Sequence, residues 1–214
     1  MISHRYLAGL AYARFPQIRW RYPPYQNCVY LTFDDGPYLP VTLPLLEYLK
    51  EAGVPATFFL SGESLYRHRH QLDQLDYDGH VIGNHSFHHI PHFGIRGRHL
   101  AREIDATDRI ILTEFGRLAR VFRPPYGIFG RALFPVLKST GKTMVLWTVM
   151  AYDFKWSSGK ILDHLRKNVR PGDIVVFHDS PQTQEVLMNI IPPFVEYCRS
   201  RNWKFGSGEQ LHVH

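Results

Sequence analysis

The stretch CVYLTFDDGP (residues 28–37) is an apolar strand pattern that ends on two adjacent carboxylates and a Gly-Pro breaker. Residues 28–33 are rich in β-branched and aromatic side chains. They predict a strand buried on both faces, which is typical of a parallel sheet covered by helices. Asp34 and Asp35 follow at its carboxyl end. Neighbouring acids raise each other's pKa, so the pair is either a solvated turn or a site with a cation between two acids.

Strand-like and helix-like segments alternate along the chain after this stretch. Such alternation over one domain predicts an α/β fold, in which helices cover a parallel sheet. About seven units favour a sheet curled into a barrel, complete or incomplete, over a flat doubly wound sheet. A Pro pair at residues 192–193 is expected to kink or interrupt the last helix. The strands are predicted at residues 28–33, 56–60, 80–84, 119–123, 143–149, 173–178 and 203–206, and the helices at residues 43–53, 96–116, 158–169 and 183–201.

The composition is that of an ordinary globular protein. The 214 residues are 44% hydrophobic, which is enough for a full core. We therefore expect a single domain over residues 1–214, with a basic, aromatic N-terminal arm (1–27) and a core (28–207). Cys28 and Cys198 form no CxxC pattern and are predicted to be buried thiols.

The net charge of +6 comes without any run of five Lys or Arg residues and without a recognised nucleic-acid motif. We expect a diffuse basic surface and no nucleic-acid partner. No apolar run is long enough to span a membrane, and residues 1–25 lack the continuous apolar segment of a signal peptide. A cytoplasmic, monomeric protein is the resulting expectation.

Ionisable side chains lie where several predicted strands end. The carboxyl ends of the strands in a parallel barrel meet at one rim, so we expect these side chains to form a site. A surface cation is the alternative for Arg123, although the Pro-rich turn that follows it favours a fixed position. The residues are Asp34, Asp35, His85, Arg123, Asp153 and His178.

Two pairs of histidines have the i, i+4 spacing that places both rings on one face of a helical turn, where they can share a metal. They are His85 with His89 and His88 with His92. The first pair is preferred because His85 directly follows a strand, while Pro91 breaks the turn before His92. His88 and His92 are expected to be exposed or to lie behind the ligands.

One carboxylate and two imidazoles form a three-ligand site with open positions, the pattern of a catalytic zinc. Such an ion lowers the pKa of a water molecule from about 15.7 towards about 7. One acid of the Asp pair can then bind the ion while the other accepts the proton of that water. The adjacent carboxylates are tolerable because the cation lies between them.

Five motifs follow one another along the chain: TFDDGP (32–37), HSxxH (85–89), RPPYG (123–127), a W-x-V…D segment (147–153) and FHD (177–179). Taken together and in this order, they resemble the polysaccharide deacetylases of carbohydrate esterase family 4, the NodB-type domain. The resemblance covers about residues 28–207. It implies a distorted (β/α) barrel and metal-dependent removal of acetyl groups from an N-acetylated amino-sugar oligomer or polymer, such as chitin or peptidoglycan.

The resemblance also implies a role for each site residue. Asp34 would be the general base, held ionised by Arg123. His178 would be the general acid, oriented and charged by Asp153. The remaining roles are Asp35, His85 and His89 as ligands of zinc, with cobalt or nickel able to substitute; the backbone N–H of Tyr126, in the turn with Pro125, at the oxyanion; and Phe177 at the pocket for the acetyl methyl group.

The chain departs from the family pattern at three positions. Met150 replaces the first acid of the D-x-x-D-W motif, Phe154 replaces its Trp, and Phe177 replaces a Leu. The acyl group and the sugar are therefore open. Alternatives are a deacylase or deformylase of another acylated amino sugar or sugar-lipid, and an inactive sugar-binding relative. An inactive relative would be expected to lose Asp34 or His178, and both are present.

Two other metal chemistries fit the sequence less well. A non-haem iron oxygenase also uses two His and one carboxylate, but a second acid and a distal His supply a hydrolytic base and acid here instead. A metalloprotease of the HExxH type is excluded because Ser86, not Glu, follows His85.

Overall fold

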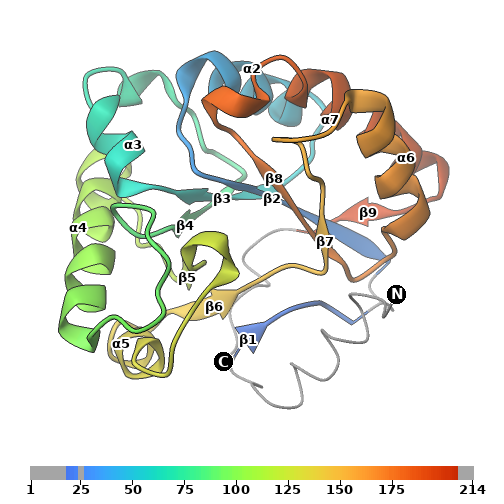
Figure 1. Cartoon of the computed structure of the whole chain (residues 1–214). Coiled ribbons are helices and arrows are strands. Elements are labelled where there is room, and N and C mark those ends of the chain that lie inside the picture. The colour runs from blue at the N-terminus through green and yellow to red at the C-terminus, as the bar shows by residue number, and fades with distance from the viewer. Residues whose placement is uncertain (1–17, 24–26, 207–214) are drawn as a thin grey trace.

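Nine strands form the sheet in the computed structural model, which describes residues 18–23 and 27–206. Figure 1 shows the sheet curling into an open barrel with helices outside it. The strands are β1 (Ile18–Arg19), β2 (Cys28–Asp34), β3 (Ala56–Leu60), β4 (Val81–Asn84), β5 (Val121–Phe122), β6 (Thr143–Val145), β7 (Val149–Met150), β8 (Ile174–His178) and β9 (Lys204–Phe205).

The strand order is β1-β6-β5-β4-β3-β2-β8-β7, with β9 added beside β2, and every pair of strands is parallel. Strands β1 and β7 lie at the two ends of this order, so the sheet is curled without being closed. A curled parallel sheet with outer helices is the fold class predicted from the sequence, which is confirmed.

In residues 27–206, six α-helices cover the outside of the sheet (Figure 1). Within the described part of the chain, none has both the length and the apolar character that crossing a bilayer requires. The helices are α2 (Leu39–Glu51), α3 (Gly62–Arg67), α4 (Gly97–Phe115), α5 (Leu133–Ser139), α6 (Ser158–Asn168) and α7 (Leu187–Ser200).

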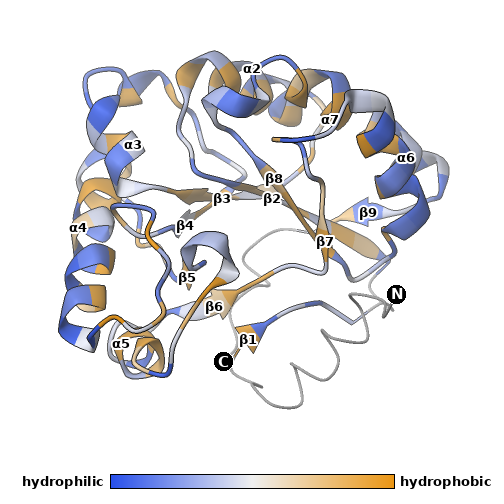
Figure 2. Cartoon of the chain, in the orientation of Figure 1, coloured by the Kyte–Doolittle hydropathy of each residue, from blue (hydrophilic) through white to orange (hydrophobic). Residues whose placement is uncertain are grey.

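Buried apolar side chains lie on both faces of the sheet, because successive side chains of a strand point to opposite faces. On β2, Leu31 and Phe33 pack outwards against the helices, and Phe33 lies 5.0 Å, centroid to centroid, from the ring of Phe58. Tyr30, the residue between Val29 and Leu31, instead packs with Phe59 in a smaller interior cluster. Figure 2 shows hydrophobic residues along the central strands and on the helix stripes that face them.

The predicted strand over residues 143–149 is split in two by the curl of the barrel. The N–H of Leu146 donates to the carbonyl of Arg19 at 2.8 Å, whereas the N–H of Thr148 donates to the carbonyl of Ile174 at 3.0 Å. Two residues that are only two positions apart thus bond to β1 and to β8, which lie on opposite sides of the gap in the open barrel. For this reason β6 and β7 are separate strands.

The predicted N-terminal arm was assigned no strand, yet its residues 18–19 form β1 beside β6. Residues 1–17 and 24–26 of the arm and residue 207 of the predicted core lie outside the described residues.

The four predicted helices are present as α2, α4, α6 and α7. Of the kink or interruption expected at residues 192–193, the interruption does not occur, because α7 runs through both prolines as one helix. Its buried face, which includes Ile190, Ile191 and Phe194, packs into the core and stabilises it. The short helices α3 and α5 were not predicted, since six or seven residues carry little periodicity. Cys198 is fully buried, as expected, whereas Cys28 is half-buried at the start of β2.

Leu45 of α2 is fully buried in the core between helix and sheet. Leu45→Ala should lower the free energy of unfolding by about 2–5 kcal/mol, because the cavity left behind cannot fully collapse. Leu118, 66% exposed, provides the control, and Leu118→Ala should change stability by less than about 0.5 kcal/mol. Denaturant unfolding measures both, and equal losses would contradict the placement of Leu45 in the core.

Candidate active site

A cleft opens at the rim where the parallel strands end, and it contains most of the predicted site residues. In the register of β2 and β8, Asp34 lies directly beside His178. The cleft has a volume of about 450 Å³ and is lined by Asp34, Asp35, His85, His89, Tyr126, Trp147, Met150, Phe154, His178, Ser180, Pro181 and Gln182.

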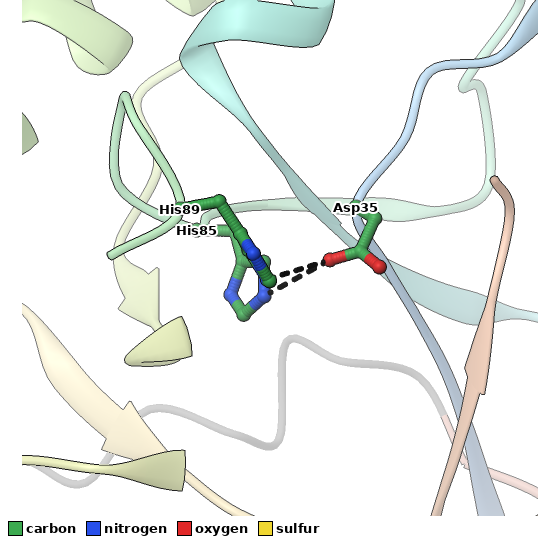
Figure 3. A group of neighbouring side chains, drawn as sticks. All are labelled: Asp35, His85 and His89. Carbon is green, nitrogen blue, oxygen red and sulfur yellow. Dashed lines mark ion pairs between the residues drawn. The ribbon is translucent and has the colours of Figure 1, made fainter. Parts of the chain in front are cut away.

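Three of these side chains converge on one point (Figure 3). Asp35 Oδ1 lies 2.9 Å from Nε2 of His89 and 3.5 Å from Nε2 of His85. One potential ligand atom from each residue lies within 4.8 Å of the other two. Asp35 Oδ1 is buried, and neither short contact has the geometry of a hydrogen bond. A buried carboxylate oxygen facing two imidazole nitrogens fits a divalent cation between them.

The other ring nitrogen of His85 supports this interpretation. Its Nδ1 lies 2.8 Å from the backbone carbonyl of Arg123. A carbonyl only accepts, so Nδ1 carries the proton and Nε2 presents its lone pair to the cluster.

The two histidines meet by a different route from the predicted helical turn, which is wrong. Residues 85–92 contain no helix. Ser86 and His89 have left-handed φ values of 69° and 51°, which fold the loop back on itself. The rings of His85 and His89 thereby lie 5.1 Å apart, centroid to centroid. The other two histidines stay outside this cluster, since the His88 side chain is 61% exposed and His92 is fully buried.

Arg123 is fully buried inside the barrel, not on the surface. Its Nη1 donates to Asp34 Oδ1 at 2.6 Å and to Thr32 Oγ1 at 2.8 Å. Nε and Nη2 donate to the backbone carbonyls of Val145 and Leu146, and the guanidinium lies 4.1 Å above the ring of Phe59. Burial lowers the pKa of Arg123 while Asp34 raises it, and a guanidinium stays protonated at neutral pH.

Asp34 is nearly buried, and its two oxygens face different groups. Oδ1 accepts from Arg123, while Oδ2 lies 3.9 Å from Nε2 of His85. The carboxylate is therefore anchored on one side and free to accept a proton on the side of the metal cluster.

His178 and Asp153 form the opposite wall of the cleft. Asp153 Oδ1 lies 2.8 Å from His178 Nδ1, and Oδ2 accepts from the His178 backbone N–H at 2.7 Å. Burial lowers the pKa of His178, but the hydrogen bond and charge of Asp153, with the charges of Asp34 and Asp35, raise it to about 9. His178 is thus an imidazolium at neutral pH, and its Nδ1 proton is directed to Asp153.

Tyr126 lines the cleft from the short helical turn η3 (Pro125–Gly127), where its ring lies 4.6 Å from that of His89. Pro125 is buried behind it and does not line the cleft. Phe177 is also absent from the cleft, contrary to its predicted place at the acyl pocket. Side chains alternate along β8, so His178 faces the cleft and Phe177 faces the core, 5.6 Å from the ring of Phe33.

Asp179 is a buried residue to which the sequence reasoning gave no role, although it closes the FHD motif. Its backbone N–H donates to the carbonyl of Asp34 at 3.1 Å, and its carboxyl accepts from Thr42 Oγ1 at 2.7 Å. Burial raises its pKa well above the usual range. A side chain at Gly36 would clash with this carboxyl group, which explains the glycine of the DDGP stretch.

Several cleft residues were not predicted as site residues. Trp147 and Met150 had been noted only as parts of a motif, and Ser180, Pro181 and Gln182 only follow the strand that delivers His178. For residues 180–182 the one sequence signal is their position after a strand end.

The sequence matches the family described as polysaccharide deacetylase over residues 21–145. A chitooligosaccharide deacetylase of Azorhizobium caulinodans is 34% identical over 76% of this chain and 79% of the relative. A peptidoglycan-N-acetylglucosamine deacetylase of Bacillus cereus is 30% identical over 82% of this chain and 85% of the relative.

Solved structures show the same similarity. The peptidoglycan N-acetylglucosamine deacetylase Bc1960 superposes with a TM-score of 0.85 at 25% identity, over 92% of this chain and 93% of the other. A carbohydrate esterase family 4 pseudoenzyme of Bacillus anthracis superposes with a TM-score of 0.79 at 26% identity, over 90% of this chain and 67% of the other. Since an inactive protein shares the fold, activity has to be argued from the site residues.

Asp153→Asn should lower the pKa of His178 from about 9 towards or below the ordinary value of about 6.5, because burial then acts without its counter-charge. An NMR titration of the His178 ring in metal-free protein measures the shift. Asp163→Asn, at an exposed carboxylate of α6, is the matched control and should leave that pKa unchanged. A His178 pKa that stays near 9 in Asp153→Asn would refute the assigned cause.

Proposed function

The chain belongs to the polysaccharide deacetylase family, and from that premise we propose that it is a metal-dependent hydrolase of N-acetylated amino sugars. The substrate would be an N-acetylglucosamine-type oligomer or polymer, since the relatives named above act on chitooligosaccharide and peptidoglycan. The observation that carries the proposal is the meeting of a His₂Asp cluster, a buried carboxylate and an imidazolium in one cleft.

Asp35, His85 and His89 would hold the ion, most suitably zinc, with cobalt or nickel as substitutes. When bound, a divalent ion lowers the pKa of water and polarises a carbonyl oxygen. The remaining steps belong to the side chains around the cluster.

Asp34 would accept the proton of the attacking water. Arg123 anchors its Oδ1, while Oδ2 faces the cluster. The backbone N–H of Tyr126, whose turn is fixed by Pro125, would donate to the oxyanion. His178 would then protonate the leaving sugar amine, with Asp153 keeping the ring charged and oriented.

The identity of the acyl group depends on the apolar wall of the cleft. Trp147, Met150 and Phe154 line it together, and Met150 stands where the family motif carries an acid. This favours a second candidate, a deacylase of another acylated amino sugar or sugar-lipid. An inactive sugar-binding protein is disfavoured because Asp34 and His178 are both present and positioned in the cleft.

The test is acetate release from chitooligosaccharides and peptidoglycan fragments by protein of known metal content, beside a panel of N-formyl and longer N-acyl sugars and acylated sugar-lipids. Faster cleavage of an N-acetyl oligomer supports the proposal. Preference for another acyl group would favour the second candidate, and no cleavage by metal-loaded protein would favour an inactive relative.

Substitutions of the two adjacent acids should differ in their effects on metal content and on activity. Asp35→Ala should remove bound metal and activity together, because it deletes one of three ligands. Asp34→Asn should retain the metal and reduce kcat by about 10²- to 10⁴-fold, as expected for loss of a general base. Metal analysis and steady-state kinetics measure both quantities. Equal loss of metal in the two variants would show that their roles are wrongly assigned.

His178→Ala should abolish hydrolysis of the sugar amide and largely spare an activated aryl acetate, whose leaving group needs no proton. In the unmodified protein, amide kcat/KM should decline as the pH rises through the pKa of His178, because the proton donor is lost. That alkaline decline should be absent from the residual activity of His178→Ala. Equal losses with both substrates would show that His178 is not the donor.

A further inference from the structure

The loop that carries both histidine ligands, residues 85–92 (the histidine loop), has no regular secondary structure to fix its shape. Two of its residues, Ser86 and His89, adopt left-handed φ values that favour glycine. Such a conformation persists only where surrounding contacts hold it.

A single buried acid on α4 supplies several of those contacts. Glu103 is only 4% exposed. Its Oε2 accepts from the backbone N–H of His88 at 2.9 Å and from Ser86 Oγ at 3.3 Å, and its Oε1 lies 2.8 Å from His88 Nδ1. Burial raises the pKa of Glu103, but the hydrogen bonds and charge of His88 lower it by a larger amount. The net pKa is therefore below its usual value, and the carboxylate is ionised at neutral pH.

These contacts bracket the ligands along the chain. Ser86 directly follows His85, and His88 directly precedes His89. Ser86 Oγ also lies 3.0 Å from Nε2 of the buried His92, which ties the far end of the loop to the same carboxylate.

Helix α4 is a firm support for this acid. Its Leu100, Ile104 and Ile111 are fully buried. Asn84, at the end of β4, donates to the Ile104 carbonyl at 2.9 Å and accepts from the Ser86 N–H at 2.8 Å. The start of the histidine loop is therefore attached to the same helix turn as Glu103.

We propose that Glu103 is a positioning residue that holds the histidine loop in the shape that directs His85 and His89 at one ion, and so sets the affinity of the site for metal. The inference rests on the proposed metal site. Glu103 touches neither histidine ligand in the described contacts, and it acts through Ser86 and His88.

The test compares two substitutions that differ in what they leave for the loop. Glu103→Leu removes all three contacts. Glu103→Gln keeps an oxygen for the His88 N–H and the Ser86 hydroxyl, and its amide can donate to His88 Nδ1 once that ring carries its proton on Nε2. Glu114→Leu, at an exposed acid of the same helix, is the matched control.

Zinc and cobalt dissociation constants are measured by chelator competition on metal-free protein, together with the visible spectrum of the cobalt form and the Tm of the metal-free form. Glu103→Leu should raise the dissociation constants of both ions by about 10- to 100-fold, the usual effect of losing a group that orients metal ligands. Its cobalt spectrum should change, while Glu103→Gln and Glu114→Leu should stay close to the original protein.

A protein that binds neither ion before substitution would overturn the proposed function and this inference together. Normal binding before substitution and an unchanged constant in Glu103→Leu would overturn this inference alone, as would a decline in Tm without any change in affinity or spectrum. If Glu103→Leu lacks a cooperative thermal transition, His88→Ala decides, because its 61% exposed ring is not needed for folding. It should weaken cobalt binding, and unchanged binding would overturn the inference.

Discussion

The buried ion pair between Arg123 and Asp34 constrains the whole site. A guanidinium with no solvent exposure is tolerable only when a counter-charge and acceptors surround it. Here two side-chain oxygens of β2 and two backbone carbonyls at the end of β6 accept its hydrogen bonds. The ring of Phe59 lies against the face of the guanidinium. Removing either partner would leave an uncompensated charge, which costs about 3–5 kcal/mol in buried pairs. The interior of the barrel is thus organised around one cation, and that cation defines where the first carboxylate sits.

The second consequence is a separation of charge across the cleft. Asp34 and Asp35 lie on one wall with Arg123 and the two histidines, and His178 lies on the other with Asp153 behind it. Asp34 and His178 each have their own counter-charge, so a proton acceptor and a proton donor can coexist in one pocket at neutral pH. Amide hydrolysis needs both, because water must lose a proton and the amine must gain one.

Paired strands position some residues of the site, and an irregular loop positions the others. Asp34 and His178 lie within or at the ends of paired strands, and their spacing follows from the register of β2 and β8. His85 and His89 lie on an irregular loop whose shape depends on Asn84 and Glu103. Side-chain contacts thus contribute to the geometry of this loop, which is why a buried acid beside it has functional weight.

Local pattern was sufficient for the long helices, for most of the strands and for the chemistry at the strand ends. Residues 56–60 form the predicted strand without a shift, and the acids after residue 33 and the histidine at residue 178 lie at the expected rim. These features depend on side-chain type within a few residues of the chain. The pairing of His85 with His89 was also found from spacing, although the helical turn assumed for it does not exist.

Contacts between distant segments decided the rest. A strand buried on both faces has no polar alternation, so the apolar run of β8 could not show that Phe177 faces the core and His178 the cleft. The division of residues 143–149 depends on where the barrel opens, and the position of β1 depends on β6. The role of Glu103 is visible only once α4 packs beside the histidine loop, because no local spacing links an acid on a helix to the backbone of a preceding loop. Residue type and order are local properties of the chain, whereas facing, register and support arise from packing, and that is the physical boundary between what sequence and tertiary structure determine in this protein.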